Sequence, residues 1–322
     1  MGFRRLKQLG VLGINRRNAD FTLRYNPRGR YPLVDDKLLT KDLARKAGIA
    51  IPELYGVVEI AHQIRTLETL LESHEDFVVK PSRGSGGMGI LVVTGRTRRM
   101  HRTSDGSLIS GEELAHHVLN VLSGMYSLAG QPDRALIEYR VIFDPVFEGV
   151  SYQGVPDIRI IVFQGVPVMS MVRLPTRMSG GRANLHQGAV GAGIDLATGR
   201  TLTGVWRNQV VTEHPDTGNR VTDILIPNWP TLLRLASQCH ELAGLGYLGV
   251  DIVLDREKGP LILELNARPG LSIQIANRAG LLPRLQEVER HRGDLATLEE
   301  RVEFARSRFP AETGTLDSRL DR

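Results

Sequence analysis

The segment from Gly249 to Leu271, GVDIVLDREKGPLILELNARPGL, constrains the fold of this chain most. Two apolar runs of strand length lie on either side of a turn-like stretch at residues 255–260, which predicts an antiparallel hairpin. Residues two apart on a strand share a face, so Glu264 and Asn266 should lie side by side, with Asp251 on the preceding strand. Carboxylates among so many aliphatic neighbours are costly unless a cation or hydrogen bonds compensate them.

These three side chains are candidate metal ligands. Hard oxygen donors suit Mg²⁺, which usually binds through one or two carboxylates together with substrate phosphates. The alternative is an exposed hairpin whose polar residues simply face water. Short carboxylate motifs match by chance often enough that this segment alone leaves both interpretations open.

Length and composition limit the class of protein. With 322 residues, 41% of them hydrophobic, the chain can bury a sizeable core, and ~150 residues per domain allows about two domains. No apolar run approaches the ~18 residues of a membrane span, and the N-terminal apolar stretch is too short for a secretory signal. Cys239 is the single cysteine, which excludes an internal disulfide framework. We expect a cytoplasmic protein without a membrane span.

The basic residues are unevenly distributed. The net charge is +5 and the isoelectric point is near 9.5. Nucleic acid, anionic lipid or an acidic substrate could each meet such patches. Because no zinc-finger spacing or RNA-binding signature is present and aromatic residues make up 5%, a solvated basic face is favoured over nucleic-acid binding. The clusters are Arg96, Arg98, Arg99, His101 and Arg102, and Arg4, Arg5, Lys7, Arg16 and Arg17.

The N-terminal third begins with an expected extended arm. Residues 1–32 hold few periodic apolar positions and several turn formers, including Asn26-Pro27-Arg28-Gly29. A helix is predicted from Asp35, because apolar residues recur at helical spacing, acidic residues favour the start and Gly48 favours the end.

A glycine-dense loop follows the next predicted strand. Phe77-Val78-Val79 runs into Lys80-Pro81, the loop occupies Ser82 to Gly89, and residues 90–93 form a second strand. The usual phosphate loops open a helix. A loop between two strands could instead fold as a flap whose backbone N–H groups cover phosphates, with Lys80 supplying a point charge. The alternative is a flexible hairpin turn beside a surface lysine.

Taken together, the motifs resemble the ATP-grasp superfamily over about residues 33–280. Among them, DIR, NLHQGA, GVDI and ELNARPG look most like the RimK-type branch, whose members join an amino acid to a carboxylate, commonly glutamate onto a peptide or protein. The stretches GINRRNADF and YPLVDDKLLTK resemble a set of alpha-L-glutamate ligase-like proteins. The residues that carry the resemblance are Asp36-Lys37, Lys80-Pro81, the glycine loop, Ile137-Glu138, Asp157-Ile158-Arg159, Arg173, Asn184-Leu185-His186, Gly249-Val250-Asp251 and Glu264-Leu265-Asn266.

The resemblance implies an α+β ATP-grasp fold, in which two subdomains with antiparallel sheets clamp the nucleotide, without the full N-terminal domain of related ligases. The expected division is an N-terminal arm at 1–32, a catalytic domain at 33–290 with an insertion at about 94–135, and a charged C-terminal tail at 291–322. The insertion should contain a helix from Gly111 to Leu128, either a lid or a peripheral element. The tail should be helical and end in disorder.

The resemblance also implies an ATP- and Mg²⁺-dependent carboxylate–amine ligase that works through an acyl phosphate. It assigns Lys37 and Lys80 to the nucleotide phosphates and Ser85, Gly86 and Gly87 to the closing flap. Glu138 would hold the adenine and ribose edge. Asp251, Glu264 and Asn266 would hold two Mg²⁺ ions, for which Mn²⁺ can substitute. Lys80, Arg159 and Arg173 would form the catalytic set, the arginines facing the transferred phosphoryl group. Arg182, Asn184, His186 and Arg268 would be candidate substrate contacts.

The expected partners are an amino acid, with glutamate or another acidic residue favoured, and a peptide or protein acceptor. A partner subunit in a homo-oligomer or a large acceptor could supply the missing wall of the substrate site. Two alternatives remain open from the sequence. One is a catalytically silent ATP-binding scaffold, and the other is a basic nucleic-acid-binding protein.

Overall fold

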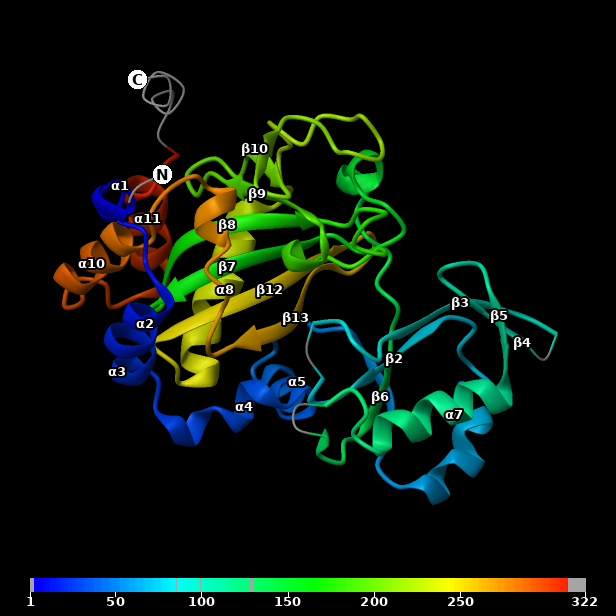
Figure 1. Cartoon of the computed structure of the whole chain (residues 1–322). Coiled ribbons are helices and arrows are strands. Elements are labelled where there is room, and N and C mark those ends of the chain that lie inside the picture. The colour runs from blue at the N-terminus through cyan, green and yellow to red at the C-terminus, as the bar shows by residue number, and fades with distance from the viewer. Residues whose placement is uncertain (1–2, 85, 99, 128–129, 312–322) are drawn as a thin grey trace. The chain divides into compact units, whose positions relative to one another are not determined.

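The computed structural model describes residues 3–84, 86–98, 100–127 and 130–311. The chain divides into two compact units, which are described separately (Figure 1). Unit 1 comprises Met1–Tyr31, Pro145–Ile252 and Leu265–Arg322, and unit 2 comprises Pro32–Asp144 and Val253–Glu264.

Unit 2 is built on a six-stranded sheet with the order β1-β6-β2-β3-β4-β5, in which all neighbouring strands are antiparallel. The strands are β1 (Leu54–Val58), β2 (Phe77–Pro81), β3 (Leu91–Thr97), β4 (Met100–Thr103), β5 (Leu108–Ser110) and β6 (Ala135–Glu138). The helices are α4 (Pro32–Asp35), α5 (Lys37–Lys46), η3 (Ala61–Thr66), α6 (Leu67–Leu71) and α7 (Gly111–Leu122).

The helices of unit 2 follow from local signals. Asp36 is the N-cap of α5, because its side chain accepts a hydrogen bond from the Leu38 N–H, which confirms the predicted helix start. Helix α7 begins with a capping box between Ser110 and Glu113.

Helix α7 is not peripheral to the core of unit 2. Its apolar face packs against buried residues of the sheet, so the predicted helix in the insertion is confirmed, although it ends at Leu122 and not at residue 128. Met125, which the predicted range would place within the helix, lies beyond its end and is 64% exposed. The shared core cluster is Val58, Leu67, Leu71, Phe77, Val79, Val93, Leu114, Val118, Val121, Ala135 and Ile137.

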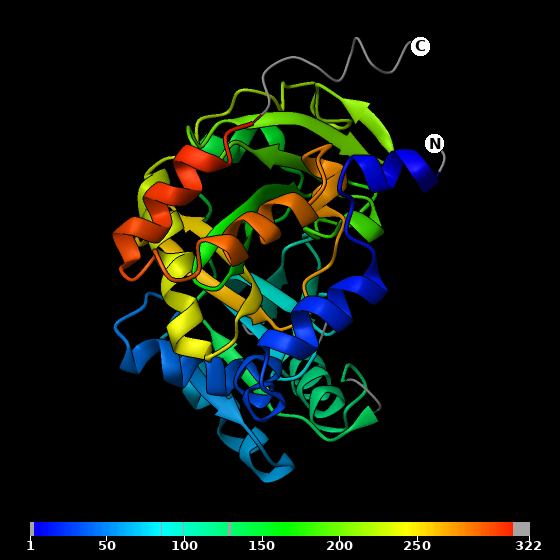
Figure 2. The ribbon, with the colours of Figure 1, turned by 90° about the vertical axis from the view of Figure 1, so that its left-hand side faces the viewer.

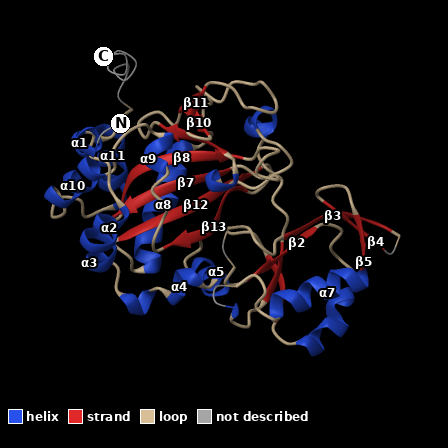
Figure 3. Ribbon diagram, in the orientation of Figure 1, coloured by secondary structure: helices blue, strands red, loops and turns tan. Residues whose placement is uncertain are grey.

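The second sheet has seven strands in the order β11-β10-β9-β8-β7-β12-β13 (Figure 3) and belongs to unit 1, except for residues 253–264 of the β12–β13 hairpin, which belong to unit 2. Its strands are β7 (Asp157–Phe163), β8 (Val166–Leu174), β9 (Val190–Ile194), β10 (Thr201–Trp206), β11 (Gln209–Val211), β12 (Tyr247–Asp255) and β13 (Gly259–Asn266). Strands β12 and β13 are the predicted hairpin. Helix α8 (Trp229–Ala243) packs against β7 and β8. Further helices of this unit, besides those of the N-terminal arm, are η5 (Pro145–Val150), η6 (Leu185–Gln187), α9 (Ile273–Ala276), α10 (Leu282–Arg290) and α11 (Leu298–Arg308).

The expectation of an extended N-terminal arm is wrong. Residues 3–31 form α1 (Phe3–Gln8), α2 (Ile14–Arg16), the π-helix η1 (Arg17–Thr22), α3 (Leu23–Tyr25) and the short 3₁₀ turn η2 (Arg28–Arg30). A π-helix has more residues per turn than an α-helix. Its inward-facing residues are therefore spaced differently along the sequence, and the arm does not show the apolar spacing of an α-helix. Figure 2 views the side of unit 1 that carries this arm together with α10 and α11.

The arm folds because it can bury apolar side chains on unit 1. Leu12 and Phe21 are 1% and 2% exposed, and the ring of Phe21 lies edge-on to Phe163 with centroids 5.5 Å apart. At the other end of the chain, the predicted helical tail is present as α11. The predicted disorder of the final residues falls at 312–322, outside the described part of the chain.

Candidate functional site

The glycine loop of unit 2 joins two antiparallel strands, as predicted. Strand β2 pairs with β3 in the register Phe77–Val93. Gly86, Gly87 and Gly89 have φ angles of 65°, 77° and 73°, which side-chain-bearing residues rarely adopt. Ser85, a predicted flap residue, lies outside the described residues. The backbone between the strands therefore has the conformational freedom that a phosphate-covering flap needs.

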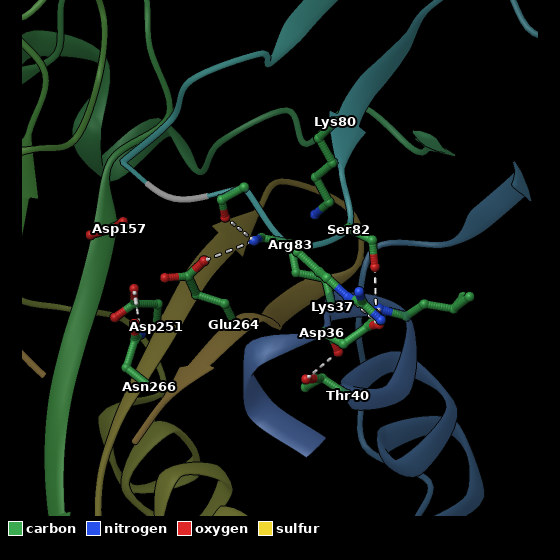
Figure 4. Close-up of polar contacts among 12 residues, drawn as sticks. Asp36, Lys37, Thr40, Lys80, Ser82, Arg83, Asp157, Asp251, Glu264 and Asn266 are labelled. Carbon is green, nitrogen blue, oxygen red and sulfur yellow. Dashed lines mark hydrogen bonds and ion pairs between the residues drawn. The ribbon is translucent and has the colours of Figure 1, made fainter. Parts of the chain in front are cut away.

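Lys37 stands at the first position of α5 and reaches the glycine loop. Its Nζ donates to the Gly84 carbonyl over 2.6 Å and lies 3.9 Å from the Glu264 carboxylate, beyond hydrogen-bond reach (Figure 4). Burial lowers the pKa of Lys37 from its ordinary value. The Glu264 carboxylate offsets this cost only in part, so an incoming anion would stabilise the charged lysine further.

Glu138 is enclosed by two lysines. Lys41 Nζ lies 2.8 Å from one carboxylate oxygen, and Lys80 Nζ pairs with the other. Burial alone would raise the pKa of Glu138, but the two lysines outweigh it and hold the pKa below the ordinary value. In the structure the Glu138 carboxylate is bound by the two lysines, and its contact with adenine and ribose stays a prediction.

Sequence reasoning missed Lys41. Its side chain is 6% exposed, its Nζ also donates to the Pro52 carbonyl over 2.7 Å, and burial lowers its pKa to about 8. The signal was present in the spacing, since Lys37 and Lys41 are four apart on one helix.

Asp36 ties the start of α5 to the strand end that precedes the flap. Besides capping α5, its carboxylate accepts a 2.5 Å hydrogen bond from the Ser82 hydroxyl and pairs with Arg134. Burial would raise its pKa, but these partners lower it below the usual range. The Lys37 N–H donates to the Ser82 carbonyl over 3.0 Å. The backbone of Lys37 and the base of the flap are thus held together.

In unit 1, four charged residues form a ladder across three adjacent strands. Asp251 on β12 stands opposite Arg159 on β7, and Asp157 on β7 stands opposite Arg173 on β8. Asp157 and Arg159 are two apart, so both pairs lie on one face of the sheet. The sequence predicted roles for Asp251, Arg159 and Arg173. It contained Asp157 only as part of the DIR motif, and it did not predict that the four residues bind one another.

The ladder is closely hydrogen-bonded. Arg159 donates from Nε and Nη2 to the two Asp251 oxygens over 2.7 and 2.5 Å. Arg173 donates to Asp157 over 2.5 Å and to Asp251 over 2.9 Å, so it bridges the two acids. This is the forked geometry in which guanidinium groups bind carboxylates most strongly.

The two acids differ in pKa. Burial raises the pKa of Asp157 to about 6, and the negative charge of Asp251 adds to the effect, whereas Arg173 opposes it. Asp251 is equally buried, but Arg159 and Arg173 outweigh that cost and lower its pKa to about 2. Asp251 therefore carries the stable charge of the ladder.

The donor set fits a metal that arrives with a nucleotide. The Asn266 amide lies 3.4 Å from Asp251, and Glu264 is on the same strand as Asn266. Among the described residues, no three His, Cys, Asp or Glu side chains gather as a metal-binding group. Because arginines already neutralise Asp251, these hard oxygens suit Mg²⁺ held mainly by substrate phosphates rather than by the protein alone.

The candidate substrate residues occupy two loops of unit 1. Asn184 caps η6 by accepting a hydrogen bond from the His186 N–H over 3.0 Å, so its side-chain oxygen has a structural partner. Arg182 and His186 are exposed, as is Arg268, whose guanidinium lies 5.2 Å from the centre of the Tyr31 ring. Their contacts with substrate stay a prediction.

The N-terminal arm holds the segment that follows Asn266. Asn26 donates to the Tyr247 and Ala267 carbonyls over 2.7 and 3.0 Å and accepts from the Tyr247 N–H over 2.8 Å. Arg17 donates to the Pro269 carbonyl over 2.8 Å.

A third polar residue completes the attachment of the arm. Gln274 binds both the N–H and the carbonyl of Leu12, over 2.8 and 3.0 Å. These contacts fix the end of β13, and their residues were missed because an isolated Asn, Arg or Gln gives no sequence signal.

No helix in the described residues is both long and apolar enough to cross a membrane.

Comparison with curated proteins found no match. Among solved structures, the chain is similar to the ATP-grasp ligase PsnB complexed with a minimal precursor, with 14% identity and a TM-score of 0.46, over 84% of this chain and 63% of PsnB. It thus spans less than two-thirds of the length of PsnB.

Two further solved structures are similar. One is a D-alanine–D-alanine ligase from Bacillus anthracis complexed with ATP, with 14% identity and a TM-score of 0.45 over 88% of this chain and 69% of the ligase. The other is the D-cycloserine synthetase DcsG, with 15% identity and a TM-score of 0.47 over 82% and 73%. The decisive match is to a family model, Sugar-transfer associated ATP-grasp, over residues 16–290. The chain belongs to this ATP-grasp family and has the ATP-grasp fold.

Proposed function

We propose that this protein is an ATP- and Mg²⁺-dependent carboxylate–amine ligase that forms an amide bond through an acyl phosphate. The observation that carries the proposal is the surplus of positive charge around Glu138. Two buried lysines share this one carboxylate, and Lys37, in the same unit, has no carboxylate within hydrogen-bond distance. A buried positive surplus beside a glycine flap suits the phosphates of a nucleotide.

The chemistry begins with a carboxylate that has no good leaving group. One of its oxygens takes the γ-phosphoryl group of ATP, which gives an acyl phosphate and ADP. An amine nitrogen then attacks the acyl carbon, phosphate leaves, and the nitrogen loses a proton to give the amide. Bound Mg²⁺, held by Asp251, Glu264 and Asn266, would neutralise phosphate charge and orient the phosphoryl oxygens.

The side chains contribute position and charge rather than a covalent nucleophile. Lys37 and Lys80 attract and hold phosphate oxygens, and the flap excludes water that would hydrolyse the acyl phosphate. The guanidinium groups of Arg159 and Arg173, held in fixed orientation by the two aspartates, face the phosphoryl group as it is transferred. Cys239 is completely buried and burial raises the pKa of its thiol to about 12, so it takes no part.

For the substrate, we favour glutamate or another acidic amino acid joined to a peptide or protein, as in the RimK-type ligases that the DIR, NLHQGA and ELNARPG motifs resemble. Exposed Arg182 and Arg268 are suited to a carboxylate, and His186 lies in the same motif as Asn184. The family description adds an association with sugar transfer, which extends the candidate acceptors to carboxylates attached to sugars.

The second candidate is an ATP-binding scaffold without turnover. It is favoured by one observation: both oxygens of Asp251 are already bound by arginines, so this side chain has less capacity for a metal.

The deciding experiment measures phosphate release from ATP and Mg²⁺ with a panel of amino acids, acidic peptides and acidic sugars, and identifies products by mass spectrometry. Wild type is compared with Glu264→Ala and with the matched control Glu257→Ala, which changes an exposed turn residue of the same hairpin. We expect stimulated release and an amide product for wild type and the control, and loss of both for Glu264→Ala.

If the protein binds ATP but no compound of the panel stimulates phosphate release, the scaffold would be favoured. Equal activity of wild type and Glu264→Ala would remove Glu264 from the metal site while leaving the ligase assignment in place.

A further inference from the structure

The positive charge of the whole chain is concentrated in the N-terminal arm. Residues 1–31 contain eight basic residues and one acidic residue, a net charge of +7, whereas the whole chain carries +5, so the other 291 residues carry −2. No acidic residue precedes Asp20. The basic residues are Arg4, Arg5, Lys7, Arg16, Arg17, Arg24, Arg28 and Arg30.

The same segment exposes large aliphatic side chains. Ile14 and Leu23 are 62% and 59% exposed, and Leu9 and Val11 are each 36% exposed. Arg4, Lys7 and Arg16 of the same segment are exposed as well, and Arg16 pairs with Asp20. Isolated exposed apolar residues need no explanation, but four within fifteen residues of a strongly basic segment do.

The arm is a fixed part of unit 1 and not a loose tail. Its inward side is anchored by buried Leu12 and Phe21 and by the hydrogen bonds of Arg17 and Asn26 described above. Figure 2 shows its helices following one another along the side of unit 1. Whatever binds the outward side is therefore held in a set orientation to the ladder of Asp251 and Arg159.

We propose that the outward side of the arm docks on an anionic lipid surface. Basic side chains are attracted to acidic headgroups, and aliphatic side chains gain by entering the boundary between headgroups and acyl chains. Nucleic acid fits less well, because single strands are bound by stacking on exposed aromatic side chains. In the arm, Phe21 is buried, and the four exposed apolar residues named above are aliphatic. The docking is peripheral and requires no membrane-spanning helix.

The test is flotation of the full chain with vesicles of phosphatidylcholine alone or mixed with phosphatidylglycerol. The charge variant is Arg4→Glu with Lys7→Glu. Its matched control is Arg96→Glu with Arg102→Glu, which reverses two exposed arginines of unit 2 and gives the same net charge. A third variant, Ile14→Ser, removes an exposed aliphatic side chain and no charge. Thermal melting of each variant verifies folding.

We expect wild type to bind the anionic vesicles and not the neutral ones. The arm variant should bind more than about tenfold more weakly, and the unit 2 control should bind like wild type. Ile14→Ser should still bind anionic vesicles through its charges. Because it lacks the aliphatic contribution, its binding should be lost at a lower salt concentration than that of wild type.

Three outcomes would overturn the proposal. These are equal flotation with both vesicle types, an equal loss in the unit 2 control, or tighter binding of a mixed-sequence oligonucleotide than of anionic vesicles at the same salt concentration. Wild-type behaviour of Ile14→Ser would overturn the aliphatic contribution.

Discussion

The two charged clusters of this protein use different basic residues and differ in how their positive and negative charges balance. In unit 2, Lys41 and Lys80 enclose one carboxylate, that of Glu138, so the cluster carries one uncompensated positive charge. In unit 1, Arg159 and Arg173 meet two carboxylates, those of Asp157 and Asp251, and the charges are equal when both acids are ionised.

This difference indicates a division of tasks. A lysine ammonium is a compact point charge, and a surplus of it attracts an anion without fixing its orientation. A guanidinium group held by forked hydrogen bonds has a fixed orientation and can position a ligand. We therefore expect changes in unit 2 to affect nucleotide affinity and folding, and changes in the ladder to affect turnover.

The largest effect is expected for Asp251→Asn. A neutral amide cannot accept the forked bonds of Arg159, so the guanidinium groups lose their fixed orientation, and one of the proposed metal ligands is lost as well. Turnover should fall by roughly 10²–10³-fold, the cost of removing one preorganised electrostatic contact. Single-turnover phosphate release would measure it.

Asp157→Asn is the comparison within the ladder. It leaves both arginines bound to Asp251, so its turnover should fall less than that of Asp251→Asn. Equal losses would show that the ladder acts as one unit without a dominant acid, and retention of activity in Asp251→Asn would contradict the division of tasks.

Lys41→Met should act mainly on folding. It leaves the buried Glu138 carboxylate with Lys80 alone, and breaking a buried ion pair from one side costs about 3 kcal/mol. Urea denaturation would measure the free energy of unfolding, with Lys46→Met, an exposed lysine on the same helix, as the control. A loss of turnover at saturating ATP without a loss of stability would place Lys41 in the catalytic set instead.

The smallest effect concerns pH and distinguishes the two clusters most sharply. The pKa of Asp157 is raised to about 6, so between about pH 4 and pH 6 the folded state binds more protons than the unfolded state. Stability should therefore fall as pH rises through this window, by on the order of 1–3 kcal/mol. Chemical denaturation of wild type and Asp157→Asn would measure the difference.

In Asp157→Asn this decrease should disappear. A decrease of the same size in both proteins would assign it to another group. The lysine cluster predicts a change of the opposite sign at the acid end of this window. Its two lysines hold the pKa of Glu138 below the ordinary value, so the stability that this carboxylate contributes is lost as pH falls and not as pH rises.

Much of the fold was predictable because the local signals agreed with the final packing. The apolar runs around residues 255–260 gave β12 and β13, the glycine stretch gave a loop between antiparallel strands, and Asp36 marked the start of α5. Each of these depends on residues close in sequence, so spacing alone is informative.

The partners of the site residues were less predictable. Arg159 and Asp251 are 92 positions apart, and only the register between β7 and β12 places them opposite each other. The role of Lys41 was missed for the same reason, because its partner Glu138 comes from β6, far along the chain. Motifs identify residues that carry chemistry, whereas their pairing depends on strand order.

The π-helix of the arm limits the insertions and deletions that this segment can accept during evolution. Its wide turn lets Arg17 and Asn26 both face the segment that follows β13, although nine positions separate them. Insertion or deletion of a single residue between them would rotate one about the helix axis relative to the other by roughly a quarter turn. The number of residues between Arg17 and Asn26 should therefore be kept among related sequences, even where the residues between them change.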